Sequence, residues 1–127
     1  MAVFVLVSAC TSGQLMERGY LSVTPSVDAQ HTAFLINKGF KQCTGNTGDL
    51  QQTGDKSWTL DYGPPMALSK TIYFTIDVTD TEVRIAPLYH TDKMRAEAGM
   101  IGEWVEAGKI TTCKSNKEHL AKWHVGK

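Results

Sequence analysis

Residues 71–89 read Thr71-Ile-Tyr-Phe-Thr-Ile-Asp-Val-Thr-Asp-Thr-Glu-Val-Arg-Ile-Ala-Pro-Leu-Tyr89, and this stretch decides the fold. Apolar side chains occupy every second position from Ile72 to Val78 and again from Val83 to Pro87. This alternation is typical of strands with one covered face. The polar triplet between the two runs has the composition of a turn. The stretch therefore predicts a hairpin of strands 71–78 and 82–89 in an antiparallel sheet.

A third strand and a turn-rich segment precede this hairpin. Residues 58–62 alternate apolar and polar side chains and are followed by Gly63-Pro-Pro65, which ends a strand. Residues 43–57 are polar and rich in glycine, so we expect turns there. Oxygens of Asn46, Asp49 and Asp55 could in principle bind calcium, but the spacing is not that of an EF-hand and no bidentate Glu closes the loop. Turns are therefore the preferred interpretation.

A helix is expected before the turns. Thr24 can cap it and Pro25 suits the first helical position, while Gly39 is the expected left-handed residue after its end. The helical spacing predicts a buried stripe with Ala33 and Ile36 on its flank. The stripe is made of Val27, His31, Phe34 and Leu35.

The C-terminal third predicts further helices. Met94, Ala98, Ile101 and Val105 keep a helical spacing after a possible cap at Thr91. Glycines inside this segment, at 99 and 102, each cost about 1 kcal/mol in a helix, and a strand-like alternation over 94–100 is an alternative. We expect a helix over 92–107 that Gly108 closes. A short strand or extended segment at 110–113 follows, and Ser115 to Glu118 has the pattern of a capping box that opens a terminal helix.

The first ten residues, Met1-Ala-Val-Phe-Val-Leu-Val-Ser-Ala-Cys10, form an uncharged apolar run with small residues before a cysteine. Val7-Ser8-Ala9-Cys10 resembles the lipobox of bacterial lipoproteins. The resemblance implies that residues 1–9 are what remains of a signal peptide and that the Cys10 thiol carries a diacylglyceryl group. Residues 10–23 would then be a lipidated tether to one domain at 24–127. The alternative is a cytosolic domain in which residues 2–8 form the first strand.

The other cysteines, Cys43 and Cys113, are an even pair if Cys10 carries lipid. In an exported chain such a pair is expected to form a disulfide. A crosslink that closes a loop of about 70 residues stabilises by about 4 kcal/mol in the chain-entropy model. In a cytosolic chain the alternative is two buried free thiols.

Composition and motifs limit the possible functions. Lys plus Arg and Asp plus Glu both number 13, so no net charge indicates a nucleic-acid partner. No stretch after the start approaches the ~20 apolar residues of a membrane span. No nucleophile–base motif, metal ligand set or cofactor motif is found. Tryptophans at 58, 104 and 123 could line a cleft, although such residues are more often core.

Together these patterns predict an α+β fold: an antiparallel β-meander covered by an N-terminal helix, with one or two C-terminal helices. The leading functional hypothesis is a lipid-anchored cell-envelope protein that acts by binding, as an accessory or assembly factor. Its partners would be the membrane and an envelope protein, and Thr11 after the cysteine favours the outer membrane in a Gram-negative cell. The alternative is a small envelope enzyme or metal-dependent hydrolase. That alternative requires His31, His90 or Asp77 to converge in one pocket.

Overall fold

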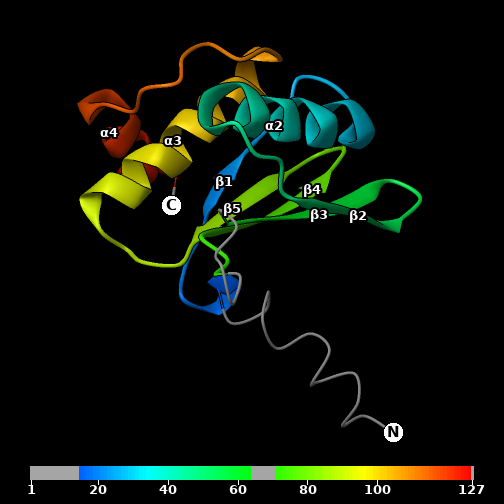
Figure 1. The fold of residues 1–127 in the computed structure, drawn as a ribbon, viewed down its shortest axis with the longest axis horizontal. Coiled ribbons are helices and arrows are strands. Elements are labelled where there is room, and N and C mark those ends of the chain that lie inside the picture. Colours follow the sequence, from blue (N-terminus) through cyan, green and yellow to red (C-terminus); the bar gives the residue numbers. More distant parts are fainter. Residues whose placement is uncertain (1–14, 64–70, 127) are drawn as a thin grey trace, which may run out of the picture.

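The computed structural model describes residues 15–63 and 71–126, which form an α+β fold (Figure 1). Within these residues, an antiparallel sheet has the strand order β1-β5-β4-β3-β2. Its strands are β1 (Leu21–Val23), β2 (Asp49–Gly54), β3 (Ser57–Tyr62), β4 (Phe74–Thr79) and β5 (Val83–Pro87). The helices are α2 (Ala29–Thr44), α3 (Asp92–Ala107) and α4 (Lys117–Gly126). The expected lipid site Cys10 and the alternative strand 2–8 lie outside the described residues.

The expected hairpin is confirmed as β4 and β5. Ile76 pairs with Ile85 and Val78 with Val83, and all four side chains are fully buried. The turn is held by Thr79, whose N–H donates to the Glu82 carbonyl oxygen at 2.9 Å. The Thr79 hydroxyl oxygen in turn accepts from the Glu82 N–H at 3.0 Å. Strand alternation thus places the apolar residues on one face of the sheet, as expected.

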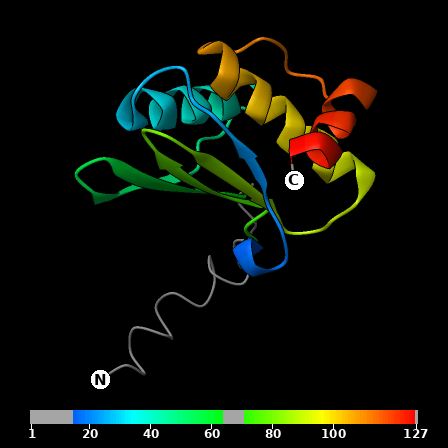
Figure 2. The ribbon, with the colours of Figure 1, turned by 180° about the vertical axis from the view of Figure 1, so that it is seen from behind.

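Helices α2 and α3 lie on the same side of the sheet (Figures 1 and 2). On α2, the ring of Phe40 stacks on Tyr62 of β3 with centroids 4.0 Å apart. Along α3, contacts are made with β5, β1 and α2. The described core is therefore the layer between these helices and the apolar face of the sheet.

The ends of α2 differ from those expected. Asp28, not Thr24, is the N-cap, and its carboxylate accepts from the His31 N–H at 2.9 Å. The helix continues through Gly39 and ends at Gly45, which has a left-handed φ of 88°. Asp is as favourable an N-cap as Thr, and the Thr24-Pro25 pattern led to the earlier start being preferred. Gly45, rather than Gly39, is the left-handed residue after the helix.

The buried face of α2 also differs from the predicted stripe. The side chains of Val27 and Phe34 are 44% and 49% exposed, and His31 is exposed. The buried face consists mostly of small side chains, which contribute little to a hydrophobic periodicity. The sequence pattern therefore did not identify this face. Its members are Ala29, Thr32, Ala33, Ile36, Gly39 and Phe40.

Two edge strands form where no strand was expected. Leu21–Val23, assigned to the tether, pairs with β5 as β1, and its Leu21 is fully buried. Leu15 is also buried, with 4% of its surface exposed. The tether therefore does not extend to residue 23, and the folded domain begins before residue 24. Asp49–Gly54, in the segment expected to contain turns, pairs with β3 as β2. Its side chains are mostly exposed and polar, so it lacks the usual strand alternation.

The helix expected over 92–107 is confirmed as α3, with Thr91 as N-cap and Gly108 as its left-handed end. The strand-like alternative for this segment is wrong. Gly99 lies in the helix because α4 crosses there: a Cβ added to Gly99 would lie 2.1 Å from the His119 carbonyl oxygen. Close helix packing, rather than a break in the helix, explains this glycine.

The segment before α4 differs in part from its predictions. Residues 110–113 are not a strand, which excludes the first of the two alternatives. Asn116, not Ser115, caps α4, because its side-chain oxygen accepts from the N–H groups of Glu118 and His119 at 2.9 and 3.1 Å. Asparagine is as good a cap as serine, and here it lies next to the first residue of the helix.

We predict that Gly99→Ala destabilises the fold although alanine favours helices by about 1 kcal/mol. The added methyl group meets backbone of α4, and overpacking of this kind costs about 1–3 kcal/mol. Urea unfolding should show a net loss of about 1–2 kcal/mol, because the gain in helix propensity offsets part of the overpacking cost. Gly102→Ala is the matched control, since its methyl group would meet side-chain ends at 3.1 Å or more. Equal stability of the two variants would contradict the packing at Gly99.

Candidate functional site

A cleft of about 520 Å³ lies between α2, α3 and the ends of β3 and β4. Volumes of roughly 300–1,000 Å³ are typical of sites for small ligands. Aromatic residues supply much of its lining, together with the apolar side chains of Met94, Met100 and Ile101. The aromatic residues are Phe40, Tyr62, Tyr73, Phe74, Tyr89 and Trp104.

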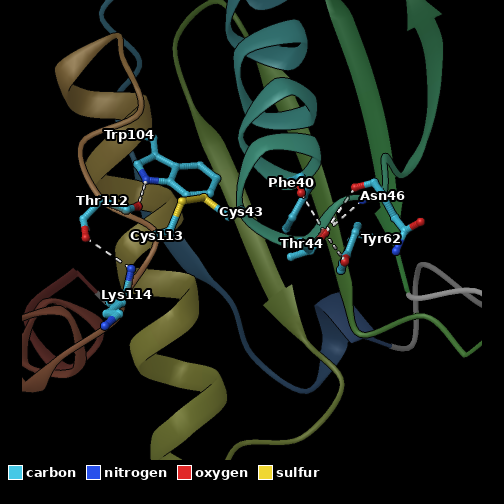
Figure 3. Close-up of a disulfide and its surroundings, with 9 residues drawn as sticks. All are labelled: Phe40, Cys43, Thr44, Asn46, Tyr62, Trp104, Thr112, Cys113 and Lys114. Carbon is cyan, nitrogen blue, oxygen red and sulfur yellow. Dashed lines mark hydrogen bonds between the residues drawn. A yellow bond between two sulfur atoms is a disulfide. The ribbon is translucent and has the colours of Figure 1, made fainter.

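A disulfide between Cys43 and Cys113 forms part of the cleft wall (Figure 3). Their Cα atoms lie 5.2 Å apart, and the bond joins the last turn of α2 to the segment that follows α3. The crosslink expected from the cysteine count is thus confirmed. The next residue toward the N-terminus, Thr112, accepts a hydrogen bond from the Trp104 indole N–H at 2.8 Å. The wall is therefore held at two successive residues.

The α2 side of the cleft is also fixed by hydrogen bonds (Figure 3). The hydroxyl group of Tyr62 donates to the Thr44 hydroxyl oxygen at 2.7 Å. Thr44 donates in turn to the Phe40 carbonyl oxygen at 2.7 Å. Phe40 also stacks on Tyr62, so α2 and β3 are joined both by ring stacking and by these two hydrogen bonds. This part of the cleft is pre-formed rather than dependent on a ligand.

The charged residues of the lining, Lys93 and Glu97, both come from α3. They are four residues apart and so lie one turn apart on the same face of the helix. Burial raises the pKa of the half-buried Glu97 carboxyl, and the positive charge of Lys93 offsets part of that rise. The cleft therefore holds a carboxylate that is incompletely solvated.

The candidates for catalysis do not share a pocket. His31 is exposed at the start of α2, with its Nδ1 2.6 Å from Asp28. His90 packs edge-on against the Trp123 ring at 5.5 Å. Asp77 lies on the sheet face away from α2 and accepts from the Thr59 hydroxyl at 3.1 Å. Burial raises the pKa of Asp77. These three residues therefore have different surroundings, and the convergence that the hydrolase hypothesis required is not found.

The candidate calcium ligands are separated by a strand. Asp49 begins β2 and Asp55 follows its end, so about 20 Å of extended chain lies between them. Across residues 15–63 and 71–126, no three His, Cys, Asp or Glu side chains gather in a way that could hold a metal ion. The polar segment thus forms an edge strand and its turn instead of a calcium loop.

Sequence reasoning identified part of this cleft and missed the rest. Trp104 was a candidate for a cleft and is among its lining residues, although it is also a core residue; Trp123 is buried in the core and lies outside the lining. Tyr89 and Glu97 were not singled out, because their proximity depends on how α3 packs against the sheet. The available signal was the helical spacing of Met94, Glu97, Ile101 and Trp104, which places them on one face.

Comparisons with family models, curated proteins and solved structures find no match to this chain. In the part of the chain that the structure describes, no helix is long and apolar enough to span a bilayer.

We predict that loss of the disulfide strongly destabilises the domain. The crosslink spans 70 residues, for which the chain-entropy model gives about 4 kcal/mol. Urea unfolding of Cys43→Ala/Cys113→Ala should show a loss of this order. Reductant should lower the stability of the wild type to a similar extent and leave that of the double variant unchanged. A wild type that is insensitive to reductant while its thiols react would contradict the prediction.

Proposed function

We propose that this chain is a lipid-anchored protein of the cell envelope that binds a small, largely apolar ligand and acts as an accessory or assembly factor. The observation that carries the proposal is the cleft of about 520 Å³, with its aromatic lining and its disulfide wall. An envelope protein is its proposed macromolecular partner.

The lining supports binding more than catalysis. Ligand sites are mostly apolar and contain a few placed polar groups, as this cleft does. Its walls are fixed by the Cys43–Cys113 bond and by the Tyr62–Thr44 hydrogen bond. Such a site loses little conformational freedom when a ligand enters, which favours affinity.

The disulfide supports the proposed compartment. Disulfides persist in oxidising environments such as the periplasm and the cell surface, and are rare in the cytosol. The Cys43–Cys113 bond therefore favours export over the cytosolic alternative. Together with the lipobox resemblance at Val7 to Cys10, it supports an envelope location, with the outer membrane preferred in a Gram-negative cell.

The ligand site can be tested with the neutral fluorescent probe N-phenyl-1-naphthylamine. We expect one molecule to bind per chain and Tyr89→Ala to weaken binding about tenfold, because an aromatic contact is lost. The side chain of Tyr89 is 59% exposed, so the variant should fold. Phe34→Ala is the matched control, since Phe34 is 49% exposed and lies outside the cleft. No binding, or equal weakening by both variants, would disprove the proposed site.

The anchor can be tested with labelled palmitate in a bacterial host that processes lipoproteins. We expect the wild type to be labelled, because a lipobox cysteine is acylated, and Cys10→Ala to lose the label. Cys43→Ala is the control and should keep it. Absence of label on the wild type, or label that survives Cys10→Ala, would exclude the proposed lipid attachment.

A further inference from the structure

We propose that the cleft selects organic cations: ligands in which an ammonium or quaternary ammonium group is carried on an apolar body. The cationic group would lie beside Glu97 among the aromatic rings. This inference rests on the proposed ligand-binding function and names the chemical class of the ligand.

The aromatic lining is the first reason. The face of an aromatic ring carries partial negative charge and attracts a cation within about 6 Å, most strongly when the site excludes water. The rings of Tyr73 and Tyr89, which are half-buried and exposed, are the ones open to the cleft, while the buried Tyr62 and Trp104 line it from the side of the core. Tyrosine and tryptophan are the ring types from which cages for quaternary ammonium groups are built.

The position of Glu97 is the second, independent reason. Met94, Glu97, Ile101 and Trp104 follow one face of α3 at helical spacing, and all four line the cleft. The carboxylate therefore lies within the apolar lining rather than outside it. Among the described residues, no hydrogen bond or ion pair within 4 Å reaches this carboxylate. A bound cation would give this carboxylate an ion-pair partner inside the cleft.

The charged side chains near this site come from α3. Lys93 opposes a cation, but it is exposed at the start of α3, where an ammonium group keeps its hydration. Arg95 is directed elsewhere, with its guanidinium 5.7 Å from the Trp123 ring centroid. The α2 and strand residues that line the cleft are uncharged. Among the described residues that line the cleft, the aromatic rings and the Glu97 carboxylate thus favour a cation, and Lys93 favours an anion.

Three probes of similar size test this choice: benzyltrimethylammonium, its neutral isostere neopentylbenzene, and the anion benzylsulfonate. Dissociation constants come from displacement of N-phenyl-1-naphthylamine at pH 7. We expect the cation to bind at least about tenfold more tightly than the neutral isostere. Glu97→Gln should remove most of this preference, measured as the ratio of the dissociation constants of the neutral probe and the cation. Glu118→Gln is the matched control, because Glu118 is exposed on α4 and lies outside the cleft.

A pH series gives a second readout. Protonation of Glu97 removes its charge, so the preference for the cation should fall as pH is lowered in the wild type and stay constant in Glu97→Gln. Equal affinities for the cation and the neutral isostere, or tightest binding of the sulfonate, would overturn the inference while leaving the ligand site intact. Failure of every probe, including N-phenyl-1-naphthylamine, would overturn the proposed function as well.

Discussion

The arrangement of the helices depends on the packing of one side chain, the indole of Trp104. Only 1% of this side chain is exposed, and it meets Phe40 of α2 edge-on with ring centroids 6.3 Å apart. Gly39 gives it room, because a Cβ there would lie 2.4 Å from the indole ring. Its N–H also binds the Thr112 carbonyl oxygen beside the disulfide. One side chain thus fixes α2, α3 and the segment after α3 relative to one another.

The cleft is a product of this arrangement rather than of any single element. Tyr62 and Phe74 come from neighbouring strands, Cys43 from α2, and Glu97 from the middle of α3. Four of the rings that line the cleft also belong to the core, so the site shares its stability with the fold; these are Phe40, Tyr62, Phe74 and Trp104. A carboxylate in such surroundings is costly for folding, because desolvation disfavours its charged form. Its presence among aromatic rings is the feature that packing alone does not explain.

The sequence predicted elements whose pattern arises from burial on one face. The alternation from Ile72 to Pro87 identified β4 and β5, and the cysteine count predicted the disulfide. Prediction from the sequence pattern failed where the buried residues are small or polar. Gly39 looked like a helix end, although it is the point at which α2 accommodates a tryptophan from α3. Glu97 could not be assigned to a site, because nothing local indicates which helix face meets the cleft.

The burial of Leu15 has a consequence for how the domain would sit in the envelope. Leu15 already belongs to the folded part, so at most four residues lie between that part and Cys10. Even fully extended, the five residue steps from Cys10 to Leu15 span no more than about 18 Å. A lipid on Cys10 would therefore hold the folded domain within this distance of the bilayer surface. The domain could reorient at the surface but could not extend across the envelope. A protein partner would therefore have to bind it close to the membrane.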